Sequence, residues 1–156
     1  MTCGIENAIS IREFRHRNMG IGLGEGPEPA DHLQVLLVED DEADIYLIKR
    51  ALTENPRVGH VTVAHDGVEA LDFLDGGSIR PDVAIVDLHM PRKDGMALLL
   101  ELSLREGGVF PAIVLTSSKS SADAMRARRR GAEMYLVKPD TMEAMTSLMA
   151  EVISHL

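Results

Sequence analysis

Acidic, hydroxyl and amine side chains each follow a short apolar segment of this chain. Glu39 and Asp40 come directly after "VLLV", and Asp87 comes directly after "AIV". Thr116 follows "IVL", and Lys138 follows "YLV". Carboxylates that lie close together repel one another and raise one another's pKa, and a bound divalent cation relieves that repulsion. Oxygen ligands without histidine or thiolate favour Mg²⁺, which completes its shell with water and phosphate oxygens. The sequence therefore predicts phosphoryl chemistry at a Mg²⁺ site, provided that these segments converge.

Each of these side chains has a task in phosphoryl chemistry. Asp87 is a carboxylate nucleophile that can form an acyl phosphate. Asp40 is predicted to bind Mg²⁺, with Glu39 assisting through water. Thr116 can donate a hydrogen bond to one phosphoryl oxygen, and Lys138 can neutralise another.

Simpler explanations exist for each position. Acids that follow a strand are often helix N-caps, and Asp41 can be only that. The literal pair Asp40–Asp41 is an alternative to Glu39–Asp40, although the latter follows the apolar segment directly. A threonine at a strand end is often a turn residue, and Lys-Pro is a common dipeptide. The coincidence of such residues at four segment ends favours the functional interpretation.

The elements that must position these residues are short apolar runs that alternate with helix-length segments. In the latter, apolar residues recur at helical spacing, as in Ile45, Ile48 and Leu52. This alternation predicts an α/β fold with a five-stranded parallel sheet covered by helices on both faces. The carboxyl ends of parallel strands form the binding crevice of such a fold. The predicted strands are Leu33–Val38, Val58–Ala64, Asp82–Val86, Ala112–Leu115 and Ala132–Val137.

Residues 1–31 differ in composition from the rest of the chain, and we interpret them as an N-terminal extension that ends in a linker. The segment "MGIGLGEGPEPAD" is rich in glycine and proline, as linkers are. Its glycines do not fit the G-x-G-x-x-G fingerprint, and the chain has no G-x-x-x-x-G-K-[ST] loop. The folded domain is predicted to span residues 32–156.

The composition excludes several classes of protein. The formal net charge of −9 argues against general nucleic-acid binding, and the one basic stretch, "MRARRRG", suits a helix C-terminus. No run of 18 apolar residues predicts a membrane span, and the N-terminus lacks a secretory signal. The single cysteine, Cys3, cannot form an internal disulfide, and no Cys/His cluster has zinc spacing. We expect a cytoplasmic protein.

Four motifs carry a family resemblance: "VLLVEDDE", "PDVAIVDLHMPRKDG", "AIVLTSSKS" and "GAEMYLVKPD". Asp87 precedes Thr116 by 29 residues, and Thr116 precedes Lys138 by 22. In this order and at these spacings, the residues resemble the receiver domain of two-component response regulators. The segments "VEDDEAD" and "LTSSKSSAD" look most similar to single-domain regulators that serve phytochrome-type histidine kinases.

The resemblance implies a doubly wound, flavodoxin-like sheet in the order 2-1-3-4-5 with five helices. It implies that a histidine kinase or phosphotransfer protein phosphorylates Asp87 with Mg²⁺, so that the chain is a phosphoprotein of a phosphorelay. Only 18 residues follow Lys138, so we expect no output domain and a signal passed to a downstream target by protein–protein interaction. We predict no enzyme activity beyond support of its own phosphoryl transfer and slow autodephosphorylation.

The resemblance also implies roles for four further residues. His89 is expected to offer its backbone carbonyl to Mg²⁺, and Ser118 lies at a position that tunes the rate of dephosphorylation. The peptide bond before Pro139 is expected to be cis. Tyr135 is the expected switch aromatic, which moves together with Thr116. Their movement would reshape the face built by the fourth helix, fifth strand and fifth helix, which offers a surface for a homodimer.

Three other functions compete with this interpretation. A phosphatase of the haloacid-dehalogenase type would want a second acid two residues after Asp87, where this chain has His89. A flavin-binding module would need a hydroxyl-rich loop after the first strand, where this chain has four acids. A degenerate receiver that only scaffolds partners would not need all five site positions filled. One departure from the family is Glu39, which stands where many receivers have aspartate.

Overall fold

Five parallel strands form one sheet within the residues that the computed structural model describes, 32–106 and 110–156. The sheet order is β2-β1-β3-β4-β5, which confirms the predicted doubly wound, flavodoxin-like fold. The predicted third and fourth strands each differ from the observed ones by one residue at one end. The strands are β1 (Leu33–Val38), β2 (Val58–Ala64), β3 (Val83–Val86), β4 (Ala112–Thr116) and β5 (Ala132–Val137). Residues 1–31 lie outside the described part, so the extension and linker stay predictions.

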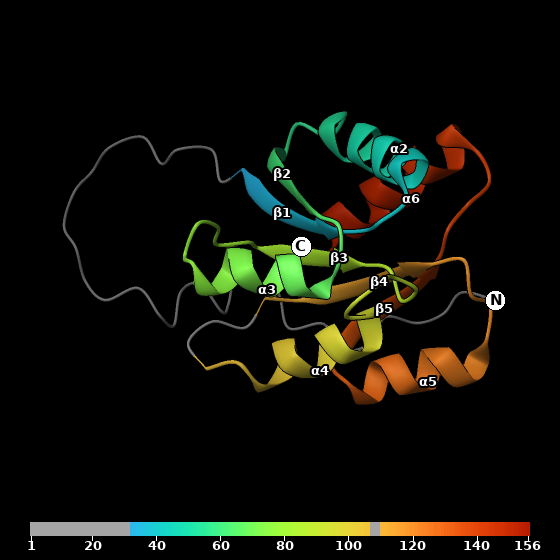
Figure 1. The fold of residues 1–156 in the computed structure, drawn as a ribbon. Helices are drawn as coiled ribbons and strands as arrows, with labels where there is room; N and C mark the ends of the chain where they lie inside the picture. The colour runs from blue at the N-terminus through green and yellow to red at the C-terminus, as the bar shows by residue number, and fades with distance from the viewer. Residues whose placement is uncertain (1–31, 107–109) are drawn as a thin grey trace, which may run out of the picture.

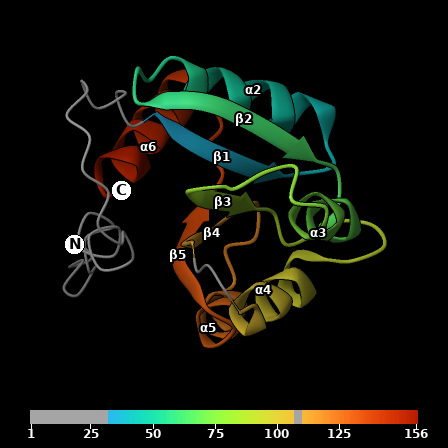
Figure 2. The ribbon, with the colours of Figure 1, turned by 90° about the vertical axis from the view of Figure 1, so that its left-hand side faces the viewer.

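Helices cover both faces of the sheet (Figures 1 and 2). Helices α2 (Glu42–Thr53) and α6 (Met142–Ser154) lie side by side on one face. The other face carries α3 (Gly67–Asp75), α4 (Gly95–Leu104) and α5 (Ser121–Arg129). In the part of the chain that the structure describes, no helix has the length and apolar character that crossing a bilayer requires.

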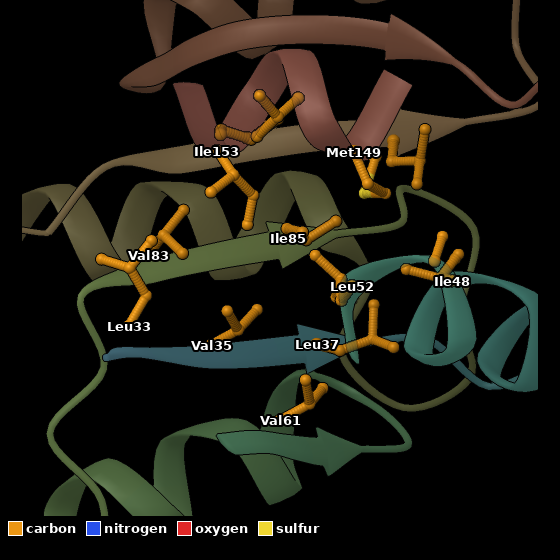
Figure 3. Packing of buried hydrophobic residues seen from close by; sticks show 14 of the residues in the cluster. Leu33, Val35, Leu37, Ile48, Leu52, Val61, Val83, Ile85, Met149 and Ile153 are labelled. Carbon is orange, nitrogen blue, oxygen red and sulfur yellow. The ribbon is translucent and has the colours of Figure 1, made fainter. Parts of the chain in front are cut away.

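The core consists of layers on both faces of the sheet, because successive side chains of a strand point to opposite sides. On β1, Val35 and Leu37 pack with residues of α2 and α6, as Figure 3 shows. The alternate residues Leu36 and Val38 pack toward α3 and α4. Burial on both faces explains why the strands are apolar almost without interruption.

A single truncation in the central strand tests this packing. Ile85 on β3 is buried within the layer that α2 and α6 cover. Ile85→Ala should lower the free energy of unfolding by about 3 kcal/mol, because it removes buried methylene groups and leaves a cavity. The measurement is urea unfolding, in which the midpoint should fall while the dependence of the unfolding free energy on urea concentration stays unchanged. Leu104→Ala on α4 is the control, since Leu104 is 72% exposed; equal losses for both variants would contradict the described core.

The loops at the carboxyl ends of the strands run directly into capped helices. In each case the capping side chain accepts a hydrogen bond from the backbone amide three residues later, as N-caps do. The caps are Asp41 for α2, Asp66 for α3, Asp94 for α4, Ser120 for α5 and Thr141 for α6. Each cap fixes the point at which the helix begins after its strand.

Two of the simpler sequence interpretations are confirmed by these helix ends. Asp41 is a helix cap, with its Oδ1 accepting from the Asp44 amide at 2.9 Å. The basic stretch supplies three arginines to the last turn of α5: Arg126, Arg128 and Arg129. Cations are favoured there by the helix dipole, so this stretch needs no separate function.

Candidate functional site

Three carboxylates converge at the carboxyl ends of β1 and β3. Glu39, Asp40 and Asp87 each place one oxygen within 4.8 Å of the others. We call these three residues the acid cluster. Glu39 is only 1% exposed and Asp87 is also buried, whereas Asp40 is exposed to solvent. The predicted pair Glu39–Asp40 therefore joins Asp87, and within the described residues the alternative partner Asp41 is not in this group.

Lys138 brings an ammonium group into the acid cluster. Its Nζ lies 2.7 Å from Glu39 Oε2 and 3.3 Å from Asp87 Oδ2. A third carboxylate, Asp44 Oδ2 from the first turn of α2, lies 2.8 Å from the same nitrogen. The Lys138 amide donates to the Thr116 carbonyl at 2.8 Å, which fixes where the side chain leaves β5.

Asp44 is a site residue that the sequence interpretation missed. It lies three residues after the cap Asp41, and so returns toward the carboxyl edge of the sheet one turn into α2. Its place in the first turn of a helix that begins directly after the carboxyl end of β1 was the available signal.

The protonation of Glu39 and Lys138 is set by their burial and by each other. Burial raises the pKa of Glu39 from its ordinary value of 4.5 to about 7. The hydrogen bond from Lys138 opposes this increase, and the charge of Asp87 adds to it. Burial lowers the pKa of Lys138, but hydrogen bonds to Asp44 and Glu39 raise it by more. Lys138 is therefore an ammonium at neutral pH, and Glu39 keeps its proton to a higher pH than an exposed glutamate does.

The side chain of Glu39 curls back onto its own loop. Its Oε1 accepts hydrogen bonds from the amides of Asp40 and Asp41, each at 3.1 Å. The other oxygen, Oε2, accepts from Lys138. This arrangement accommodates the longer side chain where many receivers have aspartate.

Asp87 is held by backbone contacts on both sides. Its amide donates to the Val38 carbonyl at 3.0 Å, and its Oδ1 accepts from the Leu88 amide at 2.8 Å. The Gly95 amide donates to the Leu88 carbonyl at 3.1 Å and closes the loop of residues 88–94. A Cβ at Gly95 would lie 2.1 Å from the Asp87 carbonyl oxygen, so this close approach requires glycine. These contacts fix the position of the Asp87 carboxylate at the end of β3.

Thr116 and Tyr135 meet through Ser118. Thr116 is fully buried at the end of β4, and its Oγ1 accepts from the Ser118 amide at 3.3 Å. The Tyr135 hydroxyl donates to the Ser118 carbonyl at 2.9 Å. The Ser118 hydroxyl in turn donates to Asp123 Oδ2 at 2.7 Å. Asp123 was not predicted, and its position in the first turn of α5 after the cap Ser120 was the signal.

One predicted feature of the site is wrong. The described residues contain no cis peptide bond, so the bond between Lys138 and Pro139 is trans. Trans is favoured by about 0.5–1 kcal/mol even before proline. With this bond trans, Lys138 still reaches Glu39, Asp44 and Asp87.

The donor set of the acid cluster fits a hard divalent cation. It offers carboxylate oxygens alone, from two buried residues, Glu39 and Asp87, and one exposed residue, Asp40. His89 lies two residues after Asp87 with its side chain exposed. Its carbonyl as a fourth ligand stays a prediction.

A parallel sheet whose carboxyl edge gathers buried acids and one lysine is the arrangement that the sequence predicts for a receiver domain. The family model for the response regulator receiver domain matches residues 35–150. The chain therefore belongs to the response regulator receiver domain family. Receivers act in two-component signal transduction and interact with histidine kinases or phosphotransfer proteins.

Relatives and solved structures agree with this assignment. The probable methanogenesis regulatory protein FilR2 of Methanothrix harundinacea is 33% identical over 138 residues, which cover 85% of this chain and 89% of FilR2. The phosphorylated cyanobacterial phytochrome response regulator RcpA has a TM-score of 0.72 at 28% identity, covering 78% of this chain and 91% of RcpA. The Mn²⁺-bound response regulator Rcp1 has a TM-score of 0.71 at 27% identity, covering 78% and 92%.

Some relatives are considerably longer than the matched region. Response regulator MprA of Mycobacterium avium is 36% identical over 122 residues, or 78% of this chain. The match spans about half of MprA, 51% of its length.

Proposed function

We propose that this chain is a phosphorelay response regulator that accepts a phosphoryl group on Asp87 from a histidine kinase or phosphotransfer protein. The observation that carries the proposal is the geometry of Asp87. Its carboxylate lies at the end of β3, within 4.8 Å of Glu39 and Asp40 oxygens and 3.3 Å from Lys138 Nζ. A nucleophile, a cation site and a fixed ammonium are the parts that phosphoryl transfer to a carboxylate needs.

The transfer step is assigned to the carboxylate of Asp87. The Leu88 amide fixes the rotation of this carboxylate by binding Oδ1, and Oδ2 faces Lys138. An Asp87 oxygen forms the bond to phosphorus while the bond from phosphorus to the donor's imidazole nitrogen breaks. The electron pair leaves with that nitrogen. Lys138 offsets the charge that remains on the phosphoryl oxygens.

The acid cluster is the proposed Mg²⁺ site, and Mn²⁺ in the similar regulator Rcp1 supports a divalent cation here. Mg²⁺ would supply positive charge to the phosphoryl oxygens when held by four groups: Asp40, Asp87, the His89 carbonyl and, through water, Glu39. Because Lys138 already bonds one oxygen of Glu39, a water-mediated role suits Glu39 better than direct ligation.

The proposed switch uses Thr116 and Tyr135. In the phosphorylated state the Thr116 hydroxyl would donate to a phosphoryl oxygen, and its contact with the Ser118 amide would be given up. Tyr135 is tied to the same residue through the Ser118 carbonyl, so both side chains respond to one loop. The consequence is a shift between two populations of the face formed by α5, β5 and α6.

The output of this switch is proposed to be protein binding. The face of α5, β5 and α6 would contact a downstream target or a second copy of the chain. No nucleic-acid partner is proposed, because the net charge is −9. The chain would act as a phosphoacceptor that slowly loses its own phosphoryl group, not as an enzyme with an external substrate. The absence of an output domain and a cytoplasmic location stay predictions.

Phosphotransfer from purified histidine kinases tests the proposal. Each kinase is first labelled with radioactive ATP and then mixed with the chain and Mg²⁺. A cognate kinase should pass its label to this chain within seconds to minutes and lose it in parallel. If none of the host's histidine kinases or phosphotransfer proteins passes label to the chain, the proposed function is wrong.

A further inference from the structure

An ion pair joins the β3–α4 loop, residues 88–94, to the start of α3. Arg92 Nε lies 2.5 Å from Asp66 Oδ2. The Asp66 side chain is only 6% exposed, although the Arg92 side chain is 62% exposed. In residues 32–106 and 110–156, Arg92 is the one residue other than glycine with a positive φ, 60°. A side chain disfavours this conformation, so the surrounding contacts must hold the loop there.

Both oxygens of Asp66 are committed to fixed partners. Oδ1 accepts from the Glu69 amide at 2.9 Å and caps α3, and Oδ2 binds Arg92. Burial raises the pKa of Asp66, but the hydrogen bonds from the Glu69 amide and Arg92 lower it by more. Asp66 is therefore ionised near neutral pH and remains a partner for the guanidinium.

A backbone contact reinforces the ion pair one residue further along. The Gly67 amide donates to the Lys93 carbonyl at 3.1 Å. A Cβ on Gly67 would lie 2.8 Å from Lys93 Cγ and 2.9 Å from the Lys93 carbonyl oxygen. Only glycine permits this close approach. Arg92 and Lys93 of the loop are therefore bound to Asp66 and Gly67 at the start of α3.

The attached loop is the one that leads away from Asp87. Its base is closed by the hydrogen bond from the Gly95 amide to the Leu88 carbonyl. His89 therefore lies between two attachments, the base at Leu88 and the contacts at Arg92 and Lys93. We propose that Asp66 and Arg92 are positioning residues, which set the affinity for Mg²⁺ by holding the β3–α4 loop and with it the His89 carbonyl. The inference rests on the proposed function in one respect, the role of that carbonyl.

A second ion pair near α3 and α4 provides a control that separates an effect on Mg²⁺ binding from a general effect on structure. Arg105 NH2 lies 2.7 Å from Asp75 Oδ1, at the last residue of α3 and the residue after α4. This pair also joins α3 to the α4 segment, but at the far ends of both helices. Asp75→Asn is therefore the matched control.

The test measures Mg²⁺ binding by titration calorimetry on the full chain after treatment with EDTA. Asp66→Asn keeps an N-cap side chain, because asparagine caps helices as well as aspartate does. Arg92→Met keeps the aliphatic stem and removes the charge. Each variant should weaken Mg²⁺ binding by about tenfold, the lower end of the effect of removing a group that orients a metal ligand. The double variant should be no weaker than either single one, and Asp75→Asn should match the wild type.

Amide exchange in the metal-free protein gives a second measurement. The Gly67 amide, which donates to Lys93, should exchange faster in Asp66→Asn and Arg92→Met than in the wild type. Affinities within twofold of the wild type in both folded variants would overturn the inference, as would losses that add in the double variant. If Asp66→Asn fails to fold, Arg92→Met alone decides the outcome, since its side chain is mostly exposed.

The two proposals fail in different ways. Absence of both Mg²⁺ binding and phosphoryl transfer in the wild type would overturn the proposed function and this inference together. Normal binding in the wild type with unchanged affinity in the variants would overturn only the inference.

Discussion

Asp87→Asn should abolish phosphoryl incorporation while leaving the fold intact. The amide has nearly the same shape as the carboxylate but cannot act as a nucleophile that forms an acyl phosphate. The Asp87 amide still donates to the Val38 carbonyl, and the asparagine side-chain oxygen can accept from the Leu88 amide. Lys138 keeps Glu39 and Asp44 as partners. Loss of a nucleophile typically lowers a rate by about four to six orders of magnitude, so labelling should fall below detection.

The measurement is intact-mass analysis after incubation with acetyl phosphate and Mg²⁺. The wild type should gain one phosphoryl group with Mg²⁺ and none with EDTA. Asp94→Asn is the matched control, because Asp94 is seven residues further along and caps α4 through the Ala97 amide. Asparagine preserves that cap, so this variant should be labelled like the wild type. Equal labelling of the Asp87→Asn variant would remove Asp87 from the mechanism.

Lys138→Met should have the second largest effect, and it acts on stability as well as on transfer. The Lys138 side chain is 9% exposed and bonds Glu39 and Asp87, both of which are buried. Removing one member of a buried ion pair leaves an uncompensated charge and costs about 3 kcal/mol of unfolding free energy. Lys49→Met on α2 is the control, because Lys49 is exposed and its replacement should change stability by less than about 0.5 kcal/mol.

The loss of unfolding free energy in Lys138→Met should depend on pH, and the protonation of Glu39 determines whether it grows or shrinks as pH rises. In the metal-free wild type the pKa of Glu39 is about 7 when folded against an ordinary 4.5. Between these values the folded state binds the additional proton, so this group makes stability fall as pH rises. Without the hydrogen bond from Lys138 the pKa of Glu39 should rise further, and the fall should continue above pH 7. Urea unfolding in EDTA should show a larger loss at pH 8 than at pH 5.5.

Millimolar Mg²⁺ should restore part of the stability of Lys138→Met, because a cation at the acid cluster compensates the same carboxylates. This recovery distinguishes the electrostatic role from a packing role of the lysine stem. A loss that is independent of both pH and Mg²⁺ would assign Lys138 to packing alone.

The parts of the fold that depend on local pattern could be predicted from the sequence. Strands such as β1 and β5 are short apolar runs bounded by polar residues, and their bounds were right to the residue. Parallel strands bring their carboxyl ends to one edge, so the four strand-end motifs located all five site residues: Glu39, Asp40, Asp87, Thr116 and Lys138. The sheet order came from the family resemblance, since periodicity does not determine which strands are neighbours.

The side-chain contacts between distant segments could not be predicted. Asp44 reaches Lys138 across 94 residues, and Arg92 reaches Asp66 across 26. Such pairs depend on how α2 and the β3–α4 loop lie in space, which no local pattern encodes. The expected cis bond at Pro139 failed for a related reason: it was carried over from the family, whereas the isomer of each such bond is decided by its own surroundings.

The most direct test of the central claim is to locate the phosphoryl group by chemistry. Borohydride reduces an aspartyl phosphate to homoserine, and peptide sequencing then identifies the converted residue. In protein labelled with acetyl phosphate and Mg²⁺, the account predicts homoserine at position 87 and at no other position. Homoserine at Asp40 or Asp44, or a phosphoryl group that resists reduction because it is on Ser117 or Ser118, would contradict it.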